Sequence, residues 1–137
     1  GNTDEALSHF RREVANHEDA SMAAINAAMI LAKAGRREDA VRYCRIAIQA
    51  DPPFGLPYFM IAADFLARGT GFEEAIELCR RGIRAAPEDS TTLIGYETLI
   101  RLLRKTGNRE EMDRVVLRLE ALRRRLESDA AAEGPDR

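Results

Sequence analysis

Histidine and cysteine are the side chains of this chain that could bind a metal or act as a nucleophile, and their spacing predicts neither role. His9 and His17 are not accompanied by a second pair of ligands. His17-Glu18 begins like the helical motif of zinc proteases, but Ser21 stands where the second histidine is needed. We therefore predict no metal site.

Cys44 and Cys79 lie at matching places in two similar segments of the sequence. Matching places on neighbouring helices are separated by about 8–10 Å, whereas a disulfide needs Cα atoms within about 7 Å. We therefore expect both cysteines to be reduced, buried and packed as small apolar side chains.

Two short segments resemble parts of a phosphate-binding loop without completing one. Lys105-Thr106 lacks the glycine before the lysine and follows no predicted strand. Gly69-Thr70-Gly71 is more simply explained as a turn between helices. No Ser-His-Asp set or pair of carboxylates is set up by spacing. The sequence predicts a protein that is not an enzyme and takes no cofactor.

The composition restricts the classes of partner. The chain has 137 residues, of which 45% are hydrophobic and 32% charged, and a formal net charge of −2. That length fits one domain, and that charge gives no basic field to hold nucleic acid. The longest uncharged stretch, 20–32, is too short for a bilayer, which takes about 20 residues, and no leader precedes it. We expect a cytoplasmic protein that binds neither nucleic acid nor membranes.

The elements that position these residues repeat with a period of about 34 residues. Gly35, Gly69 and Gly107 each follow an apolar stretch and precede charged residues, and Pro52 and Pro87 keep the same spacing. A small or apolar residue also recurs at one place in each unit. This position is filled by Ala6, Ala40, Ala75 and Met112.

Within each unit the apolar residues recur at helical spacing, as at Ala40, Cys44 and Ala47. The sequences that start at Thr70 and Asn108 have the polar-x-x-Glu form typical of a helix start. These signals predict an all-α fold without strands. About seven helices are expected, at residues 3–17, 20–34, 37–50, 54–68, 72–86, 89–106 and 108–128. The small and polar residues 128–137 are expected to form a disordered tail or linker.

This pattern resembles the tetratricopeptide repeat family, whose unit is a pair of helices with small residues at fixed places and a proline closing the second helix. The residues that match its two helices in the second full unit are Tyr58, Ile61, Ala62 and Phe65, then Ala75, Cys79, Gly82 and Pro87. The resemblance implies a right-handed α-solenoid of antiparallel helix pairs, a TPR-like superhelix, over residues 1–127. Its units would be a half repeat at 1–19, full repeats at 20–53 and 54–88, and an atypical unit at 89–127 with an extended C-terminal helix.

In this family the first helices of the units line the concave side of the superhelix. The resemblance therefore implies a largely apolar groove contributed by three helices. Its residues would be Met22, Ile25, Asn26, Met29, Leu56, Phe59, Met60, Ala63, Ile94, Glu97, Thr98 and Arg101. Flexible methionines beside Phe59 suit an apolar or amphipathic partner segment. Leu56 and Met60 stand where chaperone-binding members carry basic groups, so a chaperone tail is not the expected ligand. The alternative is that these residues are core, or are covered by another part of the parent chain.

The segment from Arg101 to Arg125 is rich in arginine. Glutamates and aspartates interleave with these arginines at helix-neighbour spacing, so a solvated face with internal ion pairs is expected, and an acidic partner is the alternative. An apolar seam with heptad-like spacing runs through the same segment, at Met112, Val115, Leu119, Leu122 and Leu126. Leu122 and Leu126 either cap the last repeat or make a self-association contact, so a monomer or a weak homodimer is expected.

Two functions follow from these observations. The first is a protein–protein interaction scaffold that binds a partner segment in the apolar groove, so that Glu at Phe59 and Met60 abolishes binding and leaves helicity intact. The alternative is a regulatory or targeting domain excised from a larger bacterial signalling or assembly protein, with its groove covered by the parent chain or by a dimer mate. The first residue, Gly1, and the start within a repeat favour a fragment.

Overall fold

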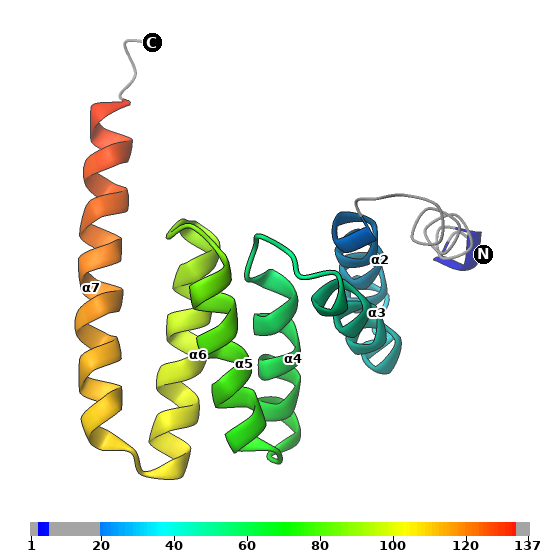
Figure 1. Ribbon diagram of the computed structural model, residues 1–137, viewed down its shortest axis with the longest axis horizontal. Helices are drawn as coiled ribbons and strands as arrows, with labels where there is room; N and C mark the ends of the chain where they lie inside the picture. The colour runs from blue at the N-terminus through cyan, green and yellow to red at the C-terminus, as the bar shows by residue number, and fades with distance from the viewer. Residues whose placement is uncertain (1–2, 6–19, 134–137) are drawn as a thin grey trace.

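The computed structural model describes residues 3–5 and 20–133, and every regular element within them is helical. The prediction of an all-α fold is therefore confirmed for this part of the chain. The six helices labelled in Figure 1 are α2 (Ala20–Lys33), α3 (Arg37–Gln49), α4 (Leu56–Arg68), α5 (Phe72–Ala85), α6 (Ser90–Thr106) and α7 (Arg109–Ala132). The half repeat expected at 1–19 lies almost wholly outside the described residues.

Glycines and polar caps set the ends of these helices. α4 and α6 end at Gly69 and Gly107, whose φ angles of 74° and 75° are left-handed and suit a residue without a Cβ. The Asp89 carboxylate accepts hydrogen bonds from the backbone N–H groups of Thr91 and Thr92 and starts α6. The side chain of Asn108 accepts the backbone N–H of Glu111 and starts α7, as predicted. The predicted cap at Thr70 is wrong: Gly71 occupies the cap position of α5 and no side chain caps that helix.

α7 is longer than predicted. It continues through Ala132, so residues 128–132, which we assigned to a disordered tail, are helical. This segment contains three alanines, and alanine has the highest helix propensity. Their preference for the helix outweighs the tendency of Ser128 and Asp129 to end it. Residues 134–137 of the expected tail lie outside the described part.

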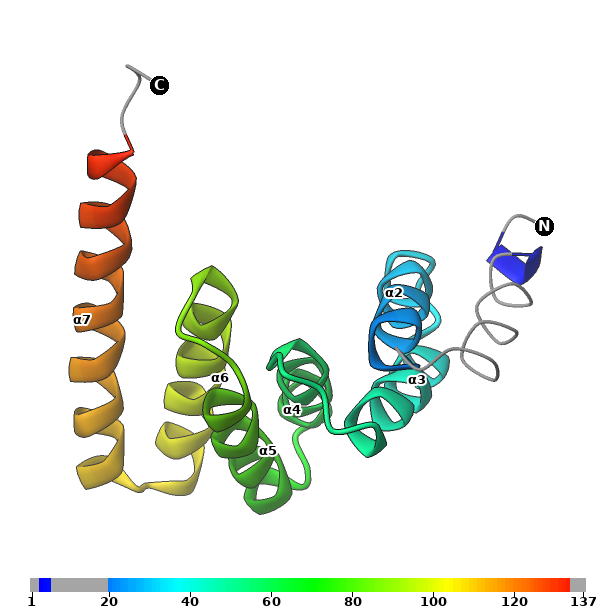
Figure 2. The same ribbon diagram turned by 45° about the horizontal axis from the view of Figure 1, so that its top comes forward.

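Each helix packs mainly against its neighbours in the sequence. The most extensive helix–helix contacts occur within three pairs, α2–α3, α4–α5 and α6–α7. Contacts between α3 and α4 and between α5 and α6 join one pair to the next. α4 also contacts α6 directly. Figures 1 and 2 show the pairs following one another from α2 at one end to α7 at the other. Ala28, Ala47 and Ala62 are fully buried, which lets the backbones of neighbouring helices approach closely.

The side chain of Phe59 joins three of these helices. It belongs to α4, is 1% exposed, and its ring lies over three glycines: Gly55 before α4, Gly82 in α5 and Gly95 in α6. A Cβ atom built on Gly82 would lie 2.6 Å from a ring carbon of Phe59, and one on Gly95 would lie closer still. Only glycine leaves room for the ring, so the positions of α4, α5 and α6 depend on this contact.

Gly82→Ala tests this packing. In an ordinary helix interior, replacing glycine by alanine stabilises by about 1 kcal/mol. Here the added methyl group overlaps the Phe59 ring, so we expect Gly82→Ala to lower the free energy of unfolding in urea by about 1–3 kcal/mol. In a Phe59→Leu background, which frees space over Gly82, the same substitution should be less destabilising. An equal effect in both backgrounds would contradict the proposed contact.

Candidate partner-binding face

The residues that the sequence analysis assigned to the groove fall into two groups, one exposed and one buried. Four large hydrophobic side chains of the described residues are exposed, and three of them belong to this set: Met22 (45%), Met29 (42%) and Ile94 (46%). The other exposed members of the set are Asn26, Ala63, Glu97 and Arg101. These side chains come from α2, α4 and α6, the first helices of the three pairs. We call the exposed residues Met22, Asn26, Met29, Ala63, Ile94, Glu97 and Arg101 the inner stripe.

Three members of the predicted set are core residues instead. Ile25 is 3% exposed, Phe59 1% and Thr98 7%. A helix turns about 100° per residue, so Ile25 lies beside the exposed position of Asn26 but faces the neighbouring helices. Phe59 is held by the three glycines, and the Thr98 hydroxyl donates to the carbonyl of Ile94 at 2.8 Å. Assigning Ile25, Phe59 and Thr98 to the groove was therefore wrong.

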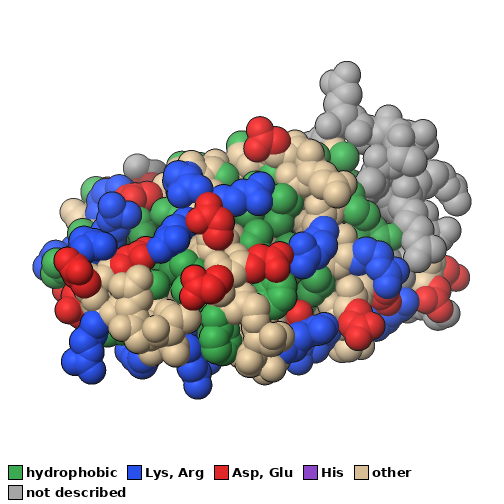
Figure 3. All heavy atoms as spheres, turned by 60° about the horizontal axis from the view of Figure 1, so that its bottom comes forward, with side chains coloured by type: hydrophobic (Ala, Val, Ile, Leu, Met, Phe, Trp, Pro, Cys, Tyr) green, Lys and Arg blue, Asp and Glu red, His purple; other side chains and the backbone are tan. Residues whose placement is uncertain are grey.

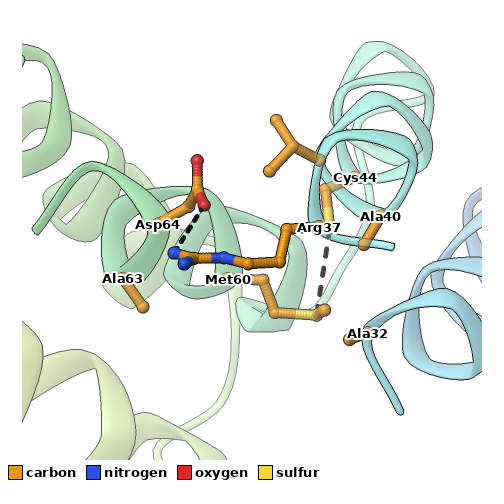
Figure 4. Close-up of a pocket in the computed structure, with 8 residues that line it drawn as sticks. Ala32, Arg37, Ala40, Cys44, Met60, Ala63 and Asp64 are labelled. Carbon is orange, nitrogen blue, oxygen red and sulfur yellow. Dashed lines mark hydrogen bonds and ion pairs between the residues drawn. The ribbon is translucent and has the colours of Figure 1, made fainter. Parts of the chain in front are cut away.

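Leu56 and Met60 of α4 are intermediate between these two groups. Both are half-buried and pack against the hydrophobic core. Met60 reaches a cleft between α3 and α4, shown in Figure 4, in which its thioether sulfur accepts from the Cys44 thiol at 3.8 Å. Ala63, of the inner stripe, also lines this cleft. The cleft is thus continuous with the α4 part of the predicted groove.

The sequence analysis did not find this cleft, which has a volume of about 200 Å³ and is mostly apolar. It is lined by Ala32, Arg37, Ala40, Val41, Cys44, Met60, Ala63 and Asp64. Four of these residues belong to α3, the second helix of its pair, whereas the predicted groove was confined to first helices. They are reachable because α2 does not make the extensive contact with α4 that α4 makes with α6. No local sequence signal marks such a difference in helix spacing.

One edge of the cleft is charged. The Arg37 guanidinium reaches from α3 to the Asp64 carboxylate of α4 at 3.0 Å, and Figure 4 shows it crossing the opening. Arg68 binds the other oxygen of Asp64 at 2.9 Å. The Asp64 side chain is only 12% exposed, so this carboxylate is held in place by two arginines. The cleft therefore has apolar walls and a polar edge that links α3 to α4.

Both cysteines are free and fully buried, as predicted. Burial disfavours the thiolate and raises the pKa of the Cys44 and Cys79 thiols to about 12. A thiol that stays protonated at neutral pH is a poor nucleophile. Cys44 therefore contributes a buried, protonated thiol that packs against Met60 in the cleft.

The end of the apolar seam on α7 caps the last helix pair. Leu122 is 2% exposed and belongs to the core, and Leu126 is half-buried against it. Because Leu122 is buried within a single chain, it is not exposed for self-association. It caps the last helix pair, which is the other role that we predicted for it. The large hydrophobic side chain that α7 exposes is Leu117, at 65%.

The arginines of α7 pair mainly with other elements. Arg114 pairs with Glu110 of the same helix at 3.6 Å, whereas Arg123 reaches Glu97 of α6 at 2.6 Å. Figure 3 shows one face of the molecule on which basic and acidic side chains lie next to one another, with apolar side chains between them. The expected ion pairs therefore exist. Most of them link α7 to α6 or to the linker before α6, and fewer lie within α7 itself.

Among residues 3–5 and 20–133, no three His, Cys, Asp or Glu side chains gather as a metal site would require. None of the helices in the described ranges is long and apolar enough to cross a membrane. His9 and His17 lie outside the described residues. No protein-family model and no curated protein matches this chain.

The raised thiol pKa values predict low reactivity. At about pH 8 a free cysteine is partly ionised, but Cys44 and Cys79 should stay protonated and unlabelled by Ellman's reagent until urea unfolds the chain. Rapid labelling of the folded protein would contradict the burial of both thiols.

The same pKa values predict a loss of stability in alkali. The unfolded thiols ionise near their ordinary pKa of 9.0 and the folded thiols near 12, so the unfolded state loses protons first as the pH rises. The free energy of unfolding should therefore fall between these values. The double variant Cys44→Ala/Cys79→Ala should show a shallower fall across the same window, and an unchanged slope would contradict the assignment.

Proposed function

We propose that this chain is a TPR-like right-handed solenoid that acts as a protein–protein interaction scaffold. Three successive antiparallel helix pairs, each packed on the next, support the solenoid arrangement. The recurring glycine turns and the buried alanines at matching places support the resemblance to tetratricopeptide repeats. Such a scaffold supplies a shaped surface and no reaction chemistry.

The observation that carries the proposal is the exposure of Met22, Met29 and Ile94. Exposed large hydrophobic side chains are few among the described residues, and three of the four lie on the face that the family resemblance assigns to partner binding. They lie on the first helices of the first and third pairs, and Met60 and the α3–α4 cleft occupy the middle pair. Each of the three helix pairs thus contributes at least one apolar side chain to the proposed face.

The chemistry of this face defines the partner segment. Methionine side chains are flexible and polarisable, so they adapt to apolar side chains of different shape. Asn26 and Arg101 lie on the inner stripe as well and offer a hydrogen-bonding amide and a positive charge, whereas Glu97 is paired with Arg123. We therefore propose an amphipathic segment, with an apolar side chain seated in the α3–α4 cleft and polar side chains along its other face.

The exposed methionines provide a better test than Phe59. Glu at Phe59 would place a charge in the buried space between Gly55, Gly82 and Gly95 and unfold the protein. A loss of binding in that variant would therefore not distinguish a lost contact from a lost fold. Met22→Glu/Met29→Glu alters side chains that are already nearly half exposed. This double variant should keep its helical circular dichroism and its midpoint in urea.

We expect peptides selected on the wild-type protein from a random library to be amphipathic. Met22→Glu/Met29→Glu should weaken their binding by at least about tenfold, because each Glu must lose its hydration against an apolar side chain. Leu117→Glu is the matched control, since Leu117 is the most exposed large hydrophobic side chain outside the stripe among the residues that the structure describes. It should bind the peptides like wild type. Equal affinity of all three proteins would contradict the proposed binding face.

A further inference from the structure

A second cleft lies away from the inner stripe and is rich in arginine. It has a volume of about 510 Å³ and lies between the end of α5, the first half of α6 and the middle of α7. Arg84 of α5 and Arg118 and Arg125 of α7 line it, together with Glu88 and Tyr96. Three guanidinium groups against one carboxylate give its lining a formal charge of +2 (3 − 1), although the whole chain carries −2.

The single carboxylate of this cleft is already engaged. Glu88 accepts a hydrogen bond from the Tyr96 hydroxyl at 3.2 Å and another from Arg125 at 3.0 Å. Arg125 also donates to the backbone carbonyl of Glu88 at 2.7 Å. This network fixes Arg125 and the linker before α6. The hydrogen bonds to the Glu88 carboxylate thus come from Tyr96 and Arg125, and neither Arg84 nor Arg118 takes part in them.

Arg84 and Arg118 remain available to a ligand. Arg84 pairs with Glu77 at 3.3 Å, but both side chains are more than half exposed, and such surface pairs are weak and exchangeable. Arg118 forms no ion pair or hydrogen bond with any of the described residues. Two cationic groups thus stand on different helices, α5 and α7, at the walls of one cleft.

The floor of the cleft is apolar. Ile83 is half-buried, Leu122 is buried, and the Tyr96 ring is 2% exposed. A cleft in low-dielectric surroundings focuses the field of its charges, and guanidinium groups bind carboxylates through two parallel hydrogen bonds. A ligand that fits must therefore combine carboxylates with apolar area between them.

We propose that this cleft binds an acidic peptide segment of a partner protein, in which carboxylates flank one apolar side chain. The carboxylates would pair with Arg84 and Arg118, and the apolar side chain would contact Ile83 and Ala121. The cleft is too large and too apolar at its base to be specific for a small inorganic anion. Nucleic acid is disfavoured because the chain is acidic overall and the Tyr96 ring is buried, so it offers no face for base stacking.

This site is separate from the proposed groove. Tyr96 and the exposed residues Ile94 and Glu97 project from different sides of α6, since successive residues are about 100° apart around a helix. The acidic-segment site therefore does not depend on the groove, and Met22→Glu/Met29→Glu should leave it unchanged. A failure of one proposal is thereby distinguishable from a failure of the other.

The test is fluorescence anisotropy with a labelled acidic peptide that has one central leucine, on the full chain at low salt. Wild type should bind the peptide, and Arg118→Gln should weaken binding by about tenfold, because it removes an unpaired charge from the cleft. Arg124→Gln removes the same charge from an exposed site on α7 that does not line the cleft, and it should bind like wild type. Glu88→Gln removes the only acid of the lining and should bind more tightly.

Three results would overturn the proposal. The first is equal binding of a control peptide in which Gln and Asn replace every Glu and Asp. The second is an equal loss in Arg118→Gln and Arg124→Gln, which would indicate general attraction to α7. The third is binding of inorganic phosphate or of a single-stranded RNA of matched charge at the same affinity as the peptide, with competition between them.

Discussion

The packing of one aromatic ring against three glycines sets the geometry of this molecule. Phe59 of α4 lies over Gly55, Gly82 and Gly95, and two of these glycines stand inside helices. Glycine in a helix interior costs about 1 kcal/mol relative to alanine. The sequence tolerates it at both places because only a helix without a Cβ there can approach α4 closely enough to enclose the ring. The relative placement of α4, α5 and α6 follows from that contact.

Consequently, the first and second helix pairs pack against each other differently from the second and third pairs. Around Phe59, α4 touches both α5 and α6, so the second and third pairs are closely packed. The step from α3 to α4 has no such ring, and it is made by the longer linker 50–55, which contains two prolines and holds Asp51 at a φ of 52°. There α2 and α4 are less closely packed, and the cleft beside Cys44 and Met60 opens. This cleft adjoins the inner stripe at Ala63, where the helix pairs are less closely packed.

Local signals in the sequence were enough to find the helices. Glycines at 35, 69 and 107 and the cap at Asn108 gave boundaries that differ from those observed by one or two residues up to the start of α7. The exposed positions Met22, Met29 and Ile94 also followed from helical spacing and the family resemblance. Ile25 and Phe59 did not, because their burial depends on which neighbouring helix they meet. Both clefts escaped prediction for the same reason, since each is formed by side chains of three helices.

Methionine methyl groups allow the most direct test of the binding face. The chain has four methionines: Met22, Met29 and Met60 on the proposed face or in its cleft, and Met112 on α7. With ¹³C-methyl-labelled methionine, NMR can follow all four while a selected amphipathic peptide is added. We predict shifts for Met22, Met29 and Met60 that saturate together, with Met112 unchanged. Saturable binding that shifts Met112, or that shifts none of the other three, would contradict the account.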